Sequence, residues 1–133
     1  MSALVLDTHT AVWYLLKSPR LSVAAFESID RALAADAFLY VSAVSILEIV
    51  YLVEKGRLPE TALERFNEVL GEPGAHIRVA PLDLAVALAA RSIPRETVPD
   101  MPDRIIAATA LHLRLPLVTR DSRIKATEIQ TIW

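Results

Sequence analysis

The 133-residue sequence predicts an α/β fold in which one domain, residues 1–133, has helices on both faces of a central parallel sheet. Three observations support this prediction. Short apolar runs of strand length alternate with longer segments of helix length, which is the pattern of βαβ units. Apolar residues make up 53% of the chain, enough to cover both faces of a sheet. The length suits one hydrophobic core.

Five short segments have the composition of strands. They are apolar, too brief for helices, and mostly rich in β-branched or aromatic residues. The first ends directly before Asp7, and the fourth ends at Thr119. The predicted strands are 3–6, 38–41, 76–79, 115–119 and 129–133.

The segments between the strands have helix signals. Ser22 is a preferred N-cap, and Lys55-Gly56 is a typical helix C-terminus. Asp83 opens an alanine-rich helix, whereas the three prolines of 94–102 predict an irregular connection. The predicted helices are 11–16, 23–35, a third from Ser42 or Ser45 to 55, 59–70, 83–92 and 103–114.

The composition excludes several classes of protein. Without cysteine, the chain has no disulfides and no cysteine-based metal site. No apolar run approaches the ~18 residues of a membrane span, and the first residues lack the pattern of a secretion signal. We therefore expect a cytoplasmic protein without membrane attachment. The net charge of −2 gives no overall basic character, although residues 91–125 hold seven Lys/Arg against four Asp/Glu.

Four acidic residues lie where predicted elements begin or end. Asp7 follows the first strand, and Asp121 follows the strand that ends at Thr119. Glu48 and Asp103 lie near the beginnings of helices. In a parallel sheet, the carboxyl ends of the strands and the helix starts that follow them share one edge, where ligand sites form. We therefore expect the four carboxylates to lie in one crevice.

Each acid also has a purely structural interpretation. Asp is a preferred N-cap, so Asp7 and Asp103 could cap the helices that follow them, and Asp121 is a common type of turn residue. Glu48 fits a capping box with Ser45, in which the carboxylate reaches back to the backbone N–H of the cap. The local sequence leaves both interpretations open at each position, and the shared edge favours a site.

Carboxylates that share a crevice repel one another and raise each other's pKa. Divalent cations relieve this repulsion, because Mg²⁺ and Mn²⁺ prefer oxygen ligands. The sequence therefore predicts a metal site suited to phosphodiester chemistry. His9 borders this site in the sequence, but we expect a surface role for it rather than a ligand role.

Four segments, in order along nearly the whole chain, carry a family resemblance. They are Leu4–His9 (LVLDTH), Ser42–Ile49 (SAVSILEI), Asp100–Ala110 (DMPDRIIAATA) and Leu117–Asp121 (LVTRD). Together they resemble the PIN-domain family and, more closely, the VapC-type toxins of bacterial toxin–antitoxin pairs.

The resemblance implies a PIN-like ribonuclease that depends on Mg²⁺ or Mn²⁺. The residues on its four acidic positions are Asp7, Glu48, Asp103 and Asp121. Thr119 falls on a hydroxyl position that supports the last acid by a hydrogen bond, and Asp100 falls on an accessory acidic position. Pro102 departs from the apolar aromatic residue usual in this subgroup. The resemblance also implies a homodimer held by an antitoxin whose tail enters the active-site groove.

We therefore expect an endoribonuclease, the toxin of such a pair, that cleaves single-stranded or looped RNA. Arg104, Arg120 and Arg123 are the expected contacts to the RNA backbone. One alternative is a PIN-like interaction module without catalysis. Another is a phosphoacceptor signalling domain, which needs a cluster of acids at the first strand, where this chain has only Asp7.

Overall fold

The computed structural model describes residues 3–133 and confirms the predicted α/β fold. Met1 and Ser2, which the predicted domain includes, lie outside the described residues. The centre is a five-stranded sheet with strand order β3-β2-β1-β4-β5, in which every neighbouring pair is parallel. The strands are β1 (Leu4–Leu6), β2 (Leu39–Ser42), β3 (Ile77–Ala80), β4 (Leu117–Val118) and β5 (Thr131–Ile132).

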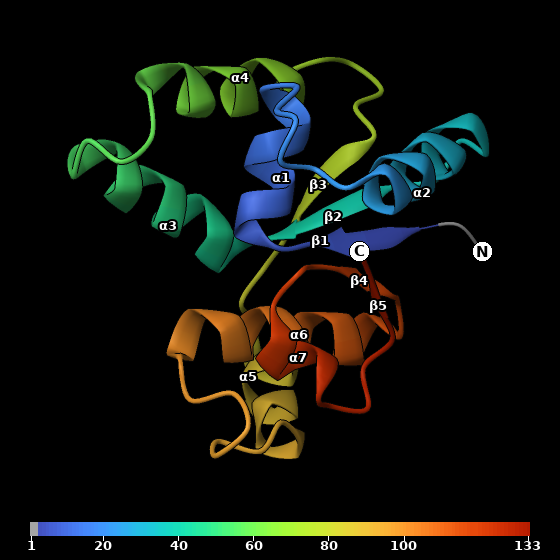
Figure 1. Cartoon of the computed structure of the whole chain (residues 1–133), viewed down its shortest axis with the longest axis vertical. Coiled ribbons are helices and arrows are strands. Elements are labelled where there is room, and N and C mark those ends of the chain that lie inside the picture. Colours follow the sequence, from blue (N-terminus) through green and yellow to red (C-terminus); the bar gives the residue numbers. More distant parts are fainter. Residues whose placement is uncertain (1–2) are drawn as a thin grey trace.

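Helices cover both faces of this sheet (Figure 1). On one face lie α1 (Thr8–Leu15), α2 (Val23–Ala34), α3 (Ala43–Glu54) and α4 (Glu60–Leu70). On the other face lie α5 (Leu84–Ala89), the 3₁₀ turn η1 (Ala90–Ser92), α6 (Met101–Leu113) and α7 (Ser122–Lys125). Within residues 3–133, no helix has the length and apolarity needed to cross a membrane.

The apolar composition of the strands follows from these two layers of helices. In β1, Leu4 and Leu6 pack into the core shared with α1–α4, whereas Val5 packs into the core shared with α6 and α7. Successive strand residues point to opposite faces, so a strand covered on both sides is apolar throughout. Phe66 and Ile106 are among the largest fully buried side chains of the two cores.

The order of the strands places a crevice beside β1. The chain proceeds outward from β1 to β2 and β3, and then returns to form β4 on the other side of β1. Such a reversal opens a crevice at the carboxyl ends of the two central strands, where α/β proteins bind ligands. Asp7 directly follows β1, and Asp121 lies three residues beyond the end of β4.

Several predicted boundaries were displaced for local reasons. Ser42, not Ser45, is the N-cap of α3, and its Oγ accepts a hydrogen bond from Val44 N at 3.2 Å. The predicted start of α6 at Asp103 is wrong, because Asp100 caps a helix that already begins at Met101. A proline in the first helical turn is compatible with this start, since its missing N–H needs no partner there.

The predictions for the final quarter of the chain were the least accurate in extent. The strands around 115–119 and 129–133 shorten to the two-residue β4 and β5. The helix α7 was not predicted, because its four residues are too few to show a periodic pattern. This short helix matters for the site, since Asp121 is its N-cap.

Candidate active site

The four predicted acids lie in one pocket at the carboxyl edge of the sheet. The pocket has a volume of about 430 Å³, and all four carboxylates are half-buried. Loops that follow β1 and β4 supply two of them, and the helices α3 and α6 supply the others. The acids that line the pocket are Asp7, Glu48, Asp103 and Asp121.

Asp7 and Asp121 are N-caps as well as pocket residues. Asp7 Oδ1 accepts a hydrogen bond from Thr10 N at 2.9 Å, which caps α1. Asp121 Oδ1 accepts from Arg123 N at 2.8 Å and Ile124 N at 3.2 Å, which caps α7. Each cap uses Oδ1 alone, and Oδ2 takes no part in it, so the structural and functional interpretations are compatible.

Thr119 fixes the backbone at the last acid, as the sequence predicted for a supporting hydroxyl. Its side chain is fully buried, and its Oγ1 accepts a hydrogen bond from Asp121 N at 3.0 Å. Because Thr119 also continues β4, this contact ties the position of Asp121 directly to the sheet.

Asp103 is not the cap of its helix, so its carboxylate is free of that role. Asp100 Oδ2 accepts a hydrogen bond from Asp103 N at 3.1 Å, and Asp100 is therefore the cap. The carboxylate of Asp103 lies in the first turn of α6 and faces the pocket. Asp100 itself is exposed and is absent from the pocket lining, which is consistent with an accessory position.

The capping-box interpretation of Glu48 is wrong, since α3 begins earlier, at Ala43. Instead, Glu48 Oε1 lies 2.6 Å from Thr8 Oγ1, which in turn lies 2.9 Å from Ser45 Oγ. An ionised carboxylate only accepts hydrogen bonds, so Thr8 donates to Glu48 and Ser45 donates to Thr8. Thr8 and Ser45 are buried, and this chain of hydroxyls fixes the direction of the Glu48 carboxylate.

The pocket concentrates negative charge. Burial, followed by the charges of Asp100, Asp121 and Glu48, raises the pKa of Asp103 from 3.8 to about 7. A hydrogen bond with the Asp121 side chain acts in the same direction. A carboxyl group with this pKa is partly protonated at neutral pH, so without a cation the pocket does not carry its full negative charge.

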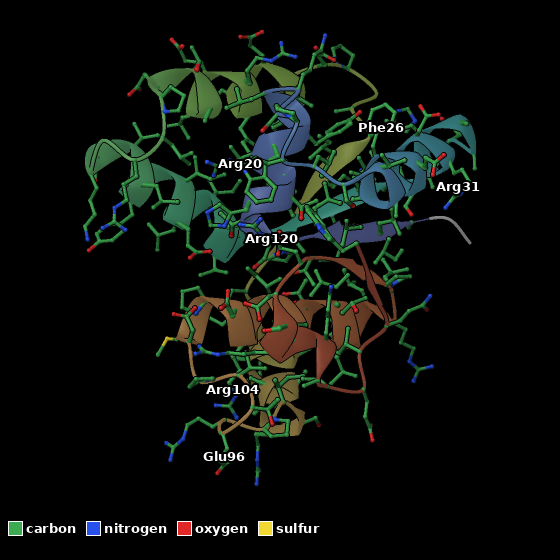
Figure 2. All side chains as sticks on the ribbon, viewed as in Figure 1. Arg20, Phe26, Arg31, Glu96, Arg104 and Arg120 are labelled. Carbon is green, nitrogen blue, oxygen red and sulfur yellow. The ribbon has the colours of Figure 1, made fainter. Side chains whose placement is uncertain are left out.

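Three arginines line the same pocket: Arg20, Arg120 and Arg123. Arg120 and Arg123 are two of the RNA contacts expected from the sequence, whereas Arg20, which lies in the turn between α1 and α2, was not among them. Arg104 lies outside the pocket, and its Nε donates to the carbonyl of Ile93 at 2.9 Å. Figure 2 shows Arg20 and Arg120 beside α1, and Arg104 much lower in the view. An RNA contact by Arg104 remains a prediction.

The pocket arginines do not neutralise the pocket carboxylates. Within residues 3–133, the only ion pairs closer than 4.0 Å are Arg65–Glu68 and Asp36–His76, both remote from the pocket. Acidic and basic groups therefore line one pocket as separate sets, and each set remains available to a ligand of opposite charge.

The acidic set fits a hard divalent cation by its chemistry. The four side chains offer only oxygen atoms, and burial together with the charges of neighbouring carboxylates raises the pKa of Asp103. Within the described part of the chain, however, no three acidic, histidine or cysteine side chains already form a group able to hold a metal ion. Binding an ion would therefore require rotation of some carboxylates, for which their half-exposed positions leave room.

The model of the PIN domain matches residues 4–130 of this sequence. The chain belongs to the PIN-domain family. The match spans every described strand except the last two-residue strand, β5, and covers all four pocket acids. The family resemblance noted in the sequence is thus confirmed.

Relatives and solved structures agree with this assignment. The chain is 32% identical over 126 residues to Ribonuclease VapC22 of Mycobacterium tuberculosis, covering 95% of this chain and 92% of that protein. It is therefore a homologue of the VapC-type ribonucleases of toxin–antitoxin systems. A structure of VapBC2 from Rickettsia felis, bound to a DNA fragment from the promoter, has a TM-score of 0.72 at 15% identity and covers 97% of this chain and 96% of that one. A toxin–antitoxin complex from Klebsiella pneumoniae has a TM-score of 0.65 at 20% identity, with 97% and 95% covered.

Proposed function

We propose that this PIN-domain protein is a metal-dependent endoribonuclease, the toxin of a cytoplasmic toxin–antitoxin pair. The observation that carries the proposal is the pocket itself, in which four half-buried carboxylates have no neutralising cation among residues 3–133. Such a set is costly to assemble unless a ligand of positive charge compensates it. The homology to a VapC-type ribonuclease supports the same chemistry.

The proposed roles follow from the geometry. Asp7, Asp103 and Asp121 would hold Mg²⁺ or Mn²⁺, which supplies Lewis-acid stabilisation and an acidic bound water. Glu48, oriented by Thr8, would complete the metal shell or orient the attacking water. Arg120 and Arg123 line the same pocket and would bind the RNA backbone. The separation of acidic and basic groups keeps the metal ligands from being occupied by the protein's own cations.

Metal binding gives the first test. A ligand that binds only the folded state raises the free energy of unfolding, by about 2.7 kcal/mol at a hundred times its Kd. We expect millimolar Mn²⁺ to raise the melting temperature of the metal-free protein by several degrees. Excess EDTA should reverse the shift. RNA cleavage by the purified protein should appear with Mn²⁺ and vanish in EDTA. Absence of both effects would contradict the proposal.

The Thr8 hydroxyl gives a second test. Thr8→Val removes the donor to Glu48 and leaves the buried Ser45 hydroxyl without its partner, which should cost about 1–3 kcal/mol of unfolding free energy. Cleavage should fall about tenfold, because Glu48 loses its orientation. Thr8→Ser retains the hydroxyl and should restore most of the cleavage. Equal cleavage by the Val and Ser variants would show that this hydrogen bond has no role in the reaction.

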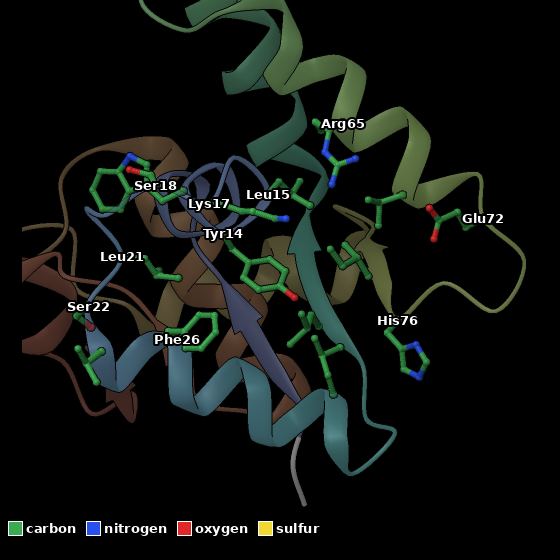
Figure 3. Close-up of a pocket in the computed structure, with 16 residues that line it drawn as sticks. Tyr14, Leu15, Lys17, Ser18, Leu21, Ser22, Phe26, Arg65, Glu72 and His76 are labelled. Carbon is green, nitrogen blue, oxygen red and sulfur yellow. The ribbon is translucent and has the colours of Figure 1, made fainter.

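An apolar groove offers a place for the antitoxin. It lies between α1, α2 and α4, has a volume of about 790 Å³, and is lined by apolar residues such as Leu21, Val69 and Ile77 (Figure 3). Phe26 and Val23 on α2 line it and are 52% and 75% exposed. A contiguous exposed apolar surface, unlike a single exposed apolar side chain, is typical of a protein interaction site. Structurally similar chains were solved as toxin–antitoxin complexes, which favours an antitoxin segment as the occupant.

The proposed homodimer needs a second apolar surface. Large apolar side chains are also exposed on α3, where Leu47 and Tyr51 are 67% and 55% exposed, and at Met101 in the first turn of α6, which packs against α3. We assign the dimer contact to this surface, away from the groove. The molar mass in solution, measured for the chain alone and after co-expression with its antitoxin, tests both contacts. A monomer in both samples would contradict them.

A further inference from the structure

We propose that Arg20, Arg120 and His9, arranged around Trp13, form a subsite that binds one nucleotide of single-stranded RNA beside the carboxylates. In this subsite the two guanidinium groups bind the phosphate, and the imidazole ring stacks on the base. The proposal rests on the proposed ribonuclease function and extends it to Arg20 and His9, which were not expected to contact the substrate.

Trp13 provides a rigid base for this subsite. Its side chain is only 6% exposed, and its ring lies 5.8 Å from the ring of Trp133 and 5.5 Å from the ring of His9. The guanidinium of Arg120 lies over the indole, 4.8 Å from the ring centroid. A stacked guanidinium keeps its N–H groups at the rim of its plane free to donate. Arg120 is therefore held in place through its face, while its donors remain available.

Arg20 comes to the same pocket from the turn that follows α1. Its backbone N donates to Ser18 Oγ at 3.2 Å, which orders the turn. The side chain is exposed and lines the pocket together with Arg120 and Trp13. Neither arginine has a carboxylate within 4.0 Å in residues 3–133. Two unpaired guanidinium groups at one pocket match the planar, bidentate recognition of a phosphate group.

His9 adds a surface for a base. It is exposed, lines the pocket, and lies one helical turn before Trp13, so both side chains share a face of α1. Bases stack on aromatic rings of this kind only when they are released from a duplex. A nucleotide that contacts both His9 and the arginines must therefore belong to a single strand.

The charge of the arginine subsite differs from that of the carboxylate site, where the proposed cleavage takes place. The four carboxylates repel a phosphate group unless a metal ion intervenes, whereas the arginines attract one directly. The arginine subsite thus suits a phosphate next to the one that is cleaved. It would fix the position of the strand, while the carboxylates act on the neighbouring bond.

Binding of a labelled ten-nucleotide single-stranded RNA, measured by fluorescence anisotropy in EDTA, tests the subsite without cleavage. Arg20→Gln and Arg120→Gln should each raise Kd about tenfold, as expected for loss of a charge-assisted contact. The double variant should also reduce the slope of log K against log salt concentration by about 0.7, the value for one phosphate neutralised in a single strand. His9→Ala should raise Kd about fivefold for the single strand and have little effect with a duplex of the same sequence.

Arg31→Gln is the matched control, because it removes the same charge from an exposed position on α2, outside the pocket. It should change Kd less than twofold, and all variants should melt like the wild type. Equal Kd values for the double variant and for Arg31→Gln would overturn the subsite, even if the wild type cleaves RNA. Conversely, the expected losses of binding in a protein that never cleaves RNA with Mn²⁺ would leave the subsite standing and refute the proposed function.

Discussion

Asp7→Asn should reduce metal-dependent RNA cleavage at least about a hundredfold while leaving the fold intact. The loss is expected because the variant amide carries no negative charge for the metal. The fold should persist because Asn caps helices as well as Asp does, so the contact from Thr10 N to the side-chain oxygen is retained. The change in unfolding free energy should stay below about 1 kcal/mol, or be slightly favourable, since one of four repelling charges is removed.

Asp83→Asn is a closely matched control for this experiment. Asp83 also caps a helix, α5, and its Oδ1 accepts from Val86 N at 3.0 Å, almost the geometry of Asp7 and Thr10. It is exposed and lies outside the carboxylate pocket. Initial rates of cleavage and melting curves of the two variants separate capping from chemistry. If Asp7→Asn cleaves RNA as fast as Asp83→Asn, with contaminating nuclease excluded by repurification, Asp7 is not a metal ligand.

The fold was predictable because its strands are buried on both faces. A run such as Leu4–Leu6 has no polar alternation, which is typical of a strand in a parallel sheet between two helix layers. The alternation of such runs with helix-length segments then determined the order of elements. Boundaries were harder, since two potential caps lay within three residues of each other at both α3 and α6. Local sequence does not decide which of two such caps a helix uses.

The sequence predicted those pocket residues whose positions follow from the ends of strands and the starts of helices. The positions of Asp7 and Asp121 follow from the strands that precede them, so topology alone brought them together. The contacts around them were not predicted, because they join residues that are far apart in the chain. Thr8 and Glu48 are 40 residues apart, and Arg120 stacks on Trp13 from the opposite end of the sequence. No local pattern distinguishes such a threonine from a cap or such a tryptophan from an ordinary core residue.

Asp103→Asn should stabilise the metal-free protein at and above neutral pH. The pKa of Asp103 is about 7 in the folded protein against 3.8 for an unperturbed carboxyl group. Between these two values, the folded state binds more protons than the unfolded state, so the free energy of unfolding falls as pH rises across this window. Above pH 7 Asp103 is ionised in both states, so the free energy of unfolding falls no further. The amide of the variant does not ionise, so its free energy of unfolding should not fall across this pH window.

The expected gain at pH 8 is about 1–3 kcal/mol, less than the full shift implies, because solvent screens a half-buried group. Denaturant unfolding in EDTA at pH 5 and pH 8 measures it, with Asp83→Asn as the control for the same substitution outside the pocket. Adding Mn²⁺ at pH 8 should reverse the order, because the wild type gains a bound ion that the variant holds poorly. A variant that is less stable than the wild type in EDTA at pH 8 would show that Asp103 is structurally required rather than repelled. The Asp103 carboxylate is thus expected to destabilise the metal-free protein and, in the same position, to be required for activity with metal.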